Sequence, residues 1–82
     1  MIRITIKLFA ILRERAGVSD IGVDLSEPAT VADASKALVA KHPELADLLP
    51  RVAYAVNRDY ARVDSPLADG DEVAVLPPVS GG

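Results

Sequence analysis

Cysteine is absent from this chain of 82 residues, and its absence excludes several kinds of chemistry. Without a thiol the chain can form no disulfide framework, no thiolate zinc site and no cysteine nucleophile. Aromatic residues are scarce as well, since the chain has one Phe, two Tyr and no Trp. Val, Ile, Leu and Ala must therefore build the core of what its length predicts to be one domain. Such a core suffices for one sheet on one or two helices and leaves little to line a deep catalytic pocket.

Basic residues do not dominate either, because the formal net charge is −3. The basic surface that nucleic acid requires is missing, so we expect no nucleic-acid partner. Apolar runs are too short to span a bilayer, and residues 1–10 alternate instead of forming the continuous apolar segment of a signal peptide. We therefore expect no membrane association and a cytoplasmic location.

Alternating apolar residues predict the strands. Residues 2–8 place Ile or Leu at every second position, the pattern of a strand with one buried face. The same alternation predicts strands at 21–25, 52–56 and 72–76, and a turn at 57–59 predicts a further short strand near 60–63. Residues 65–71, "SPLADGD", have the composition of a loop and turn.

Two helices are predicted between these strands. A short helix is expected at 11–16, with Gly17 at its end. A longer helix begins after Thr30, which forms a capping-box-like pair with Asp33, and it ends at His42 and Pro43. The first two strands are too close in sequence for a parallel crossover, so they should pair antiparallel. We expect an α+β fold with a mixed sheet of about five strands packed on one main helix.

Residues typical of enzyme active sites are few. His42 is the single histidine, so it has no second imidazole or thiol with which to complete a metal site. Asp69 and Asp71 flank Gly70, and this spacing is more typical of a turn than of a general acid and base. The glycines are scattered and do not form a phosphate-binding loop. We expect no metal site and no bound cofactor.

The last six residues, "PPVSGG", are the most distinctive motif. Glycine has no side chain, so a Gly-Gly end can enter a narrow channel in another protein, and its carboxylate is open to activation as an acyl-adenylate. Pro77 and Pro78 stop the final strand, because neither can donate a hydrogen bond to a ladder. The alternative is an inert end, because termini fray and short motifs recur by chance.

Three stretches together resemble a known family. "AVNRDY", "PLADGDEVAVLPPVSGG" and the opening "IRITIKLFAILRERAG" are similar to the small subunit of molybdopterin synthase, a ubiquitin-like β-grasp sulfur carrier. The resemblance covers nearly the whole chain, and the "PPVSGG" ending is its most specific part. It divides the chain into a β-grasp domain at 1–76 and a tail at 77–82.

The resemblance implies a cycle of activation and sulfur transfer. An E1-like adenylating enzyme would consume ATP to adenylate Gly82, and a sulfur donor would convert the adenylate to a thiocarboxylate. The tail would then enter the large subunit of a heterotetramer and pass sulfur to cyclic pyranopterin monophosphate in molybdenum cofactor biosynthesis. The catalytic acid and base would belong to the large subunit, so this chain would be its non-catalytic sulfur-donating partner. The tail contacts are expected from Pro77, Pro78, Val79, Ser80 and Gly81.

Phe9 and Leu76 are further candidates for the apolar contact with the partner; the alternative for each is simple core packing. Two other functions stay open. The chain could carry sulfur for another pathway, such as thiamine synthesis, cysteine synthesis or tRNA thiolation. It could also be a ubiquitin-like covalent modifier whose Gly82 forms isopeptide bonds with lysines.

Overall fold

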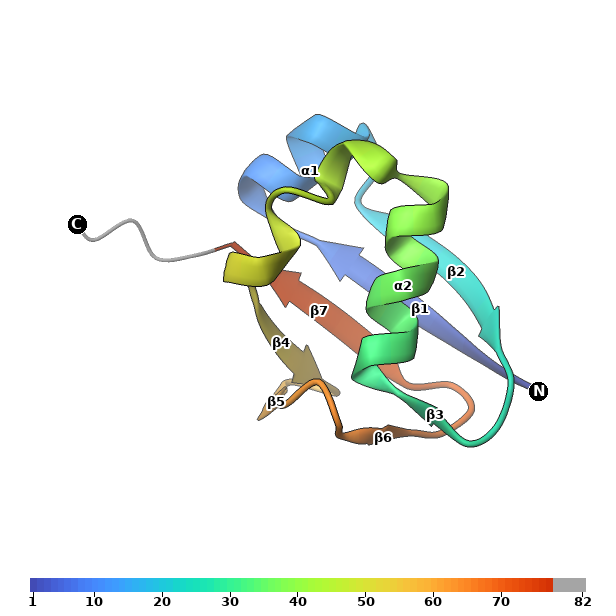
Figure 1. The fold of residues 1–82 in the computed structure, drawn as a ribbon. Coiled ribbons are helices and arrows are strands. Elements are labelled where there is room, and N and C mark those ends of the chain that lie inside the picture. The colour runs from blue at the N-terminus through green and yellow to red at the C-terminus, as the bar shows by residue number, and fades with distance from the viewer. Residues whose placement is uncertain (78–82) are drawn as a thin grey trace.

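The computed structural model describes residues 1–77. Five of the predicted tail positions therefore lie outside the described residues: Pro78, Val79, Ser80, Gly81 and Gly82. Figure 1 shows a twisted sheet with one main helix across it. The strands are β1 (Ile2–Leu8), β2 (Asp20–Leu25), β3 (Ala29–Thr30), β4 (Ala53–Val56), β5 (Asp59–Ala61), β6 (Pro66–Leu67) and β7 (Glu72–Leu76). The helices are α1 (Ala10–Ala16), α2 (Val31–Lys41) and the 3₁₀ turns η1 (Pro43–Leu45) and η2 (Leu49–Arg51).

The main sheet has five strands in the order β2-β1-β7-β4-β5. The β1 strand pairs antiparallel with β2 and parallel with β7, while β7 pairs antiparallel with β4 and β4 with β5. The first and last long strands of the chain are thus neighbours at the centre of the sheet. A mixed sheet of five strands packed on one main helix is the β-grasp arrangement, and the predicted α+β fold is confirmed.

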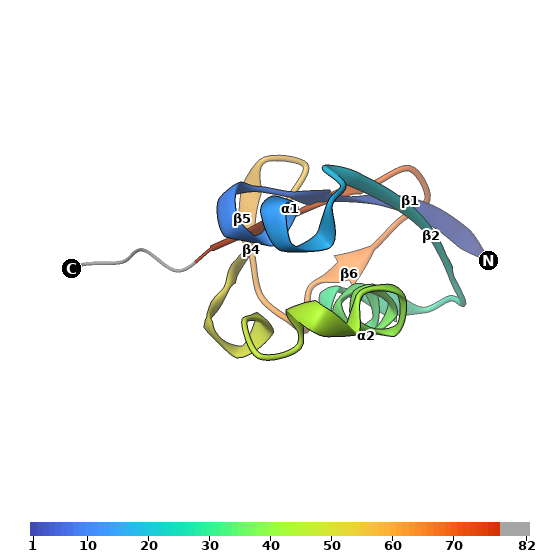
Figure 2. The ribbon, with the colours of Figure 1, turned by 90° about the horizontal axis from the view of Figure 1, so that it is seen from above.

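One face of the sheet packs against α2 to form the core (Figure 2). Alternation along β1 buries every second side chain, as the sequence pattern predicts. The helix contributes Leu38, which has no exposed surface, and the two 3₁₀ turns add Leu45 and Leu49. The sheet residues that face this core are Ile2, Ile4, Ile6, Leu8, Ile21, Val23, Leu25, Tyr54, Val73 and Val75.

The start of α2 is fixed by the pair predicted from the sequence. The backbone N–H of Thr30 donates to Asp33 Oδ2 at 2.8 Å, which satisfies a donor at the helix start and places a carboxylate at the positive end of the helix dipole. The helix ends where the N–H of His42 donates to the carbonyl of Leu38 at 2.8 Å. Pro43 then begins η1, so the predicted end of the helix is also confirmed.

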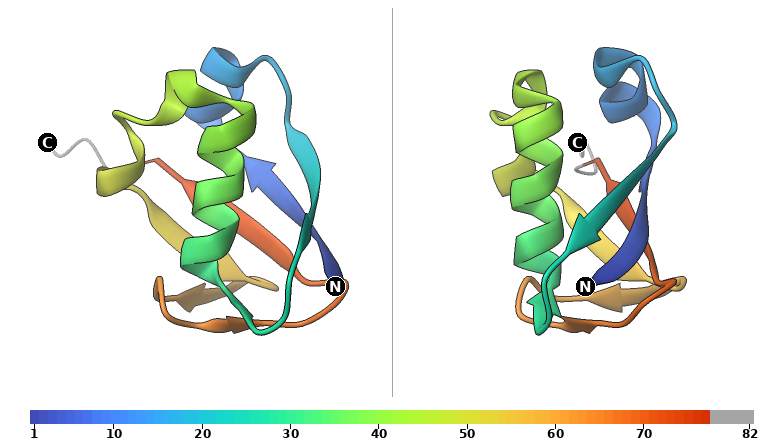
Figure 3. Two further views of the ribbon diagram at one scale, coloured as in Figure 1. Left: turned by 45° about the vertical axis from the view of Figure 1, so that its right-hand side comes forward. Right: turned by 90° about the vertical axis from the view of Figure 1, so that its right-hand side faces the viewer.

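The prediction of a plain loop at 65–71 is wrong at its start. Pro66 and Leu67 form β6, which pairs antiparallel with β3 in a separate two-stranded sheet. Figure 3 places this small sheet beside the first turn of α2. A strand of two residues has no measurable alternation, so its pairing depends on tertiary contacts rather than local sequence. The strand expected near 60–63 lies at Asp59–Ala61.

Candidate functional site

The outer face of the sheet, opposite α2, has small side chains at its centre. Ala74 of β7 lies between Lys7 of β1 and Ala55 of β4, and Ala55 in turn pairs with Tyr60 of β5. Their neighbours along the same strands point inward to the core, because side chains alternate across a strand. Two alanines flanked by longer side chains leave a depression on this face.

This depression is a groove of about 420 Å³, which we call the outer groove. The predicted contact residues Phe9 and Leu76 both line it, although β1 and β7 bring them from opposite ends of the chain. Neither belongs to the buried core, and Phe9 is 41% exposed, so core packing does not explain them. Pro77 follows Leu76 directly, so the groove adjoins the root of the tail. The full lining is Lys7, Phe9, Ala55, Arg58, Tyr60, Glu72, Ala74 and Leu76.

Two segments beside the outer groove have backbone in the left-handed region of φ/ψ space. Ala10, which follows Phe9, has φ 52°, and the turn between β4 and β5 has φ 50° at Asn57 and φ 75° at Arg58. Positive φ at both central positions is the signature of a two-residue hairpin turn that usually contains glycine. Asparagine adopts this region readily, whereas alanine and arginine in it cost about 1–3 kcal/mol each. Backbone strain is therefore concentrated beside this groove.

The side chain of Asn57 fixes the strained hairpin turn to β7. Its Oδ1 accepts from the N–H of Glu72 at 3.0 Å, and its Nδ2 donates to Asp71 Oδ1 at 2.9 Å. Its own N–H donates to the carbonyl of Glu72 at 2.9 Å. The turn therefore cannot move independently of the strand that leads to the tail.

The charges around the outer groove are unequally balanced. Lys7 Nζ lies 3.7 Å from Glu72 Oε2 and 3.8 Å from Asp20 Oδ1, so its charge is compensated. Arg58, on another wall, makes no ion pair with any carboxylate within residues 1–77. Tyr60 beside it is 84% exposed. This wall therefore presents an uncompensated cation and an exposed aromatic ring to solvent.

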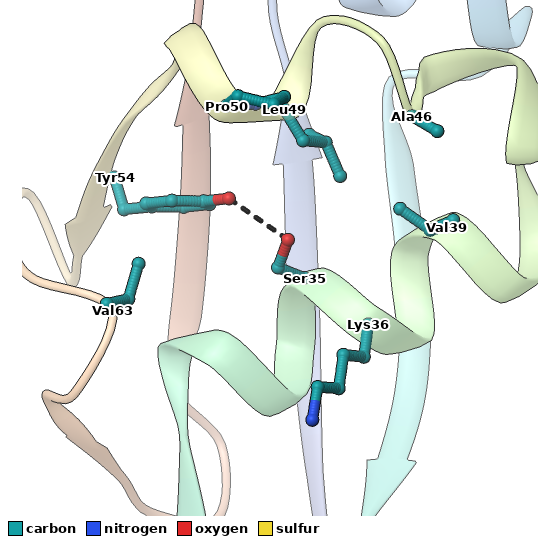
Figure 4. A pocket seen from close by; sticks show the side chains of 8 residues that line it. All are labelled: Ser35, Lys36, Val39, Ala46, Leu49, Pro50, Tyr54 and Val63. Carbon is teal, nitrogen blue, oxygen red and sulfur yellow. Dashed lines mark hydrogen bonds between the residues drawn. The ribbon is translucent and has the colours of Figure 1, made fainter.

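A second cavity of about 470 Å³ lies on the helix side of the sheet, between α2, η2 and β4 (Figure 4). We call it the helix-side pocket. Tyr54 and Ser35 both line this pocket and are joined by a hydrogen bond in which Tyr54 Oη donates to Ser35 Oγ at 3.1 Å. Lys36 is the one charged residue in the lining. No carboxylate or imidazole lines it, so it offers no general acid and base pair. The other lining residues are aliphatic: Val39, Ala46, Leu49, Pro50 and Val63.

The hydrogen bond in the helix-side pocket gives a stability prediction. Tyr54 is 8% exposed, so replacing it with Phe removes the bond without changing the packing of the ring. We expect Tyr54→Phe to lower the free energy of unfolding by about 0.5–1.5 kcal/mol in a urea titration. Tyr60→Phe is the matched control, because that ring is exposed, and it should leave the unfolding midpoint unchanged. Equal stability of both variants would contradict the assignment of this bond.

The acidic and imidazole side chains considered as catalytic candidates have structural roles. Asp69 Oδ1 accepts from the N–H of Arg3, and Asp71 Oδ2 accepts from the N–H of Ala68, both at 2.8 Å, so both aspartates hold turns, as their spacing indicated. His42 Nδ1 lies 3.2 Å from Glu44 Oε2. The pKa of Glu44 is lowered, first by a hydrogen bond from its own backbone and then by His42. Within residues 1–77, no three His, Cys, Asp or Glu side chains gather as metal ligands would.

Residues 1–77 contain no helix with the length and apolar character needed to cross a membrane.

Several lining residues of the outer groove were missed by the sequence reasoning, above all Arg58, Tyr60 and Ala74. The available signal was the pair of alanines, Ala55 in β4 and Ala74 in β7, each at an outward position in the middle of its strand.

Comparison with known proteins decides the family. The ThiS family matches residues 6–82. The chain belongs to the ThiS family. The resemblance to the small subunit of molybdopterin synthase is confirmed by a relative with the description molybdopterin synthase sulfur carrier subunit, from Chlamydomonas reinhardtii. It is 38% identical over 82 residues, which cover 98% of this chain and 99% of the relative.

A second relative of the ThiS-family chain has a different description. Small archaeal modifier protein 1 of Haloferax volcanii is 42% identical over 84 residues, covering 93% of this chain and 97% of the relative. A crystal structure of SAMP1 from the same organism superimposes with a TM-score of 0.88 at 39% identity, covering 98% of this chain and 99% of the other. The fold is thus shared by proteins whose names point to different uses of the same scaffold.

Proposed function

We propose that this ThiS-family chain is the sulfur carrier subunit of molybdopterin synthase and that Gly82 carries the sulfur. The observation that best supports the proposal is the continuity of the outer groove with the tail. Phe9 is exposed and Leu76 is half-buried, so both leave apolar surface on the groove wall beside Pro77. A partner that docks there is positioned to receive residues 77–82 in its own active site. A tail of six residues can reach at most about 20 Å from that surface.

The activation step uses the carboxylate of Gly82. One of its oxygens attacks the α-phosphorus of ATP in an E1-like adenylating enzyme, forming the acyl-adenylate and releasing pyrophosphate. A hydrosulfide-equivalent donor then attacks the acyl carbon, so that a carbon–sulfur bond forms, the carbon–oxygen bond to AMP breaks and AMP leaves. Glycine at this position leaves the carbonyl carbon unhindered. ATP is consumed by the activating enzyme, and we propose that the carrier itself binds no cofactor and acts in the cytoplasm.

The transfer step takes place on the partner. The large synthase subunit covers the outer groove and the tail enters its pocket. The thiocarboxylate sulfur attacks a side-chain carbon of cyclic pyranopterin monophosphate, so that a carbon–sulfur bond forms, a carbon–oxygen bond at that carbon breaks, and its oxygen leaves as water or as an oxygen of the opened cyclic phosphate. Hydrolysis of the resulting acyl–sulfur bond restores the Gly82 carboxylate, and a second charged carrier supplies the other sulfur of the dithiolene. The acid and base come from the large subunit, so this chain is the non-catalytic member of a heterotetramer with two copies of each subunit.

Reconstitution tests the pathway. Carrier charged with thiocarboxylate is mixed with the large subunit and cyclic pyranopterin monophosphate, and the pterin product is measured by mass spectrometry. We expect two sulfur atoms in the product and uncharged carrier at the end. Transfer to a thiamine, cysteine or tRNA precursor instead, with none to the pyranopterin, would contradict this assignment and identify a carrier of another pathway.

The relative named small archaeal modifier protein 1 favours a second candidate, a covalent modifier. In that case a lysine amine attacks activated Gly82, forms an isopeptide bond and displaces the activating group. Lysate from cells that express the tagged chain distinguishes the two functions. Conjugates of higher mass in which the C-terminal peptide 63–82 is joined through Gly82 to a lysine of another protein support the modifier, because trypsin cuts last after Arg62. Their absence together with dithiolene formation supports the carrier.

A further inference from the structure

Arg58 differs from every other residue that lines the outer groove, because its backbone is strained and its charge has no ion-pair partner within residues 1–77. It has φ 75°, a conformation that glycine adopts readily and arginine does not. A glycine would therefore suit this turn better, and the guanidinium is what arginine adds there. Strained backbone of this kind is concentrated at binding and catalytic sites.

The guanidinium is carried by an anchored turn. The three hydrogen bonds of Asn57 to Asp71 and Glu72 tie the hairpin to the start of β7. The position of Arg58 is thereby fixed relative to Leu76 and the root of the tail. A side chain on a rigid support loses less conformational freedom when it binds.

The surrounding charges define what Arg58 can bind. Lys7 is already paired with Asp20 and Glu72, while Arg58 makes no ion pair within residues 1–77. Only one cation of the outer groove is therefore available, and Glu72 lies in the same lining. A group with a single negative charge fits this balance better than a doubly charged phosphate does. The guanidinium fork matches the geometry of a carboxylate.

We propose that Arg58 determines the specificity of the outer groove by binding a carboxylate of the partner subunit. The partner segment that fits carries an Asp or Glu beside an apolar side chain. The carboxylate accepts hydrogen bonds from Arg58 next to Tyr60, and the apolar side chain lies over Ala55 and Ala74. Arginine and tyrosine are among the residue types enriched where partner binding energy is concentrated, and a partner that covers the groove would remove both from water. The inference rests on the proposed function, since the partner is the large synthase subunit.

The test compares two substitutions of Arg58 in the full-length carrier. Arg58→Gly removes the guanidinium and suits the backbone, whereas Arg58→Glu reverses the charge. Binding to the large subunit is measured by calorimetry at low and high salt. We expect Kd to rise about tenfold for Arg58→Gly and about a hundredfold or more for Arg58→Glu, because like charges face each other in the second variant. The salt dependence of Kd should fall for Arg58→Gly.

Lys36→Glu is the matched control, because it makes the same charge change on the helix side of the molecule. We expect it to change Kd less than about threefold, since a distant surface charge acts mainly through the screened overall field. Thermal unfolding of each variant confirms that the fold is intact. If the wild-type carrier binds the large subunit and the Kd of Arg58→Glu equals that of Lys36→Glu, the inference about Arg58 is wrong, while the proposed function still stands. If wild-type carrier does not bind the large subunit, both are wrong.

Discussion

Deletion of Gly82 is expected to abolish sulfur loading and dithiolene formation. The shortened tail ends about 3.3–3.6 Å short of the position that the full tail reaches. Activation by an adenylating enzyme depends on placing the carboxylate in line with the α-phosphorus, and a displacement of 1 Å can already lower a rate about a hundredfold. We therefore expect at least about a hundredfold loss in thiocarboxylate formation, measured by intact mass after timed incubation with ATP and sulfide.

The deletion leaves residues 1–77 unchanged, so thermal unfolding should match the wild-type protein. This control separates a chemical defect from a folding defect. Replacement of Lys36 by Ala is a second control, because Lys36 lines the helix-side pocket and belongs to neither the tail nor the outer groove. Loading of the deletion variant at the wild-type rate would show that Gly82 is not the acceptor of sulfur.

Filling the outer groove is expected to have the second largest effect. Ala74 lies at the centre of the groove floor, between Lys7 and Ala55 on the neighbouring strands. Ala74→Gln adds a long neutral side chain there and leaves the core side of β7 untouched. Truncation or obstruction at the centre of an interface typically costs about 2 kcal/mol or more, so we expect Kd for the large subunit to rise at least about thirtyfold.

Thr5→Gln is the matched control for Ala74→Gln. Thr5 lies on the same outer face, paired with Glu72, but it does not line the groove. Its substitution should leave Kd within about threefold of the wild-type value, because substitutions at the edge of an interface contribute little. Equal weakening by both variants would place the docking surface elsewhere on this face, and weakening by neither would contradict a role for the outer groove.

Much of the fold could be predicted from the sequence because its signals are local. Alternation marks β1 and β7, and the pair of Thr30 and Asp33 marks the start of α2. The pairing of β3 with β6 could not be predicted, because strands of two residues carry no periodic pattern and join segments far apart in sequence. Pattern reasoning identifies elements of several residues, whereas these short ladders depend on how the larger elements pack.

The candidate site was predicted only in part, for a related reason. The outer groove draws on β1, β4, β5 and β7, and their side chains meet only once the strand order is known. Phe9 and Leu76 were predicted as apolar partner contacts on one face of the sheet and at the root of the tail, and both line the groove. Arg58 was missed because the sequence indicated a turn at 57–59 but not its type, and arginine gives no sign of a left-handed backbone. Predictions about residues 78–82 stay predictions, since those residues lie outside the described part of the chain.

The most direct test of sulfur carriage is the intact mass of the purified protein, taken before and after incubation with ATP, an E1-like adenylating enzyme and a sulfide source. The carrier function predicts a mass gain equal to the replacement of one oxygen by sulfur, localised by fragmentation to the peptide that ends in Gly82. An unchanged mass, in the presence of an enzyme shown to be active on the same chain by pyrophosphate exchange, would contradict it.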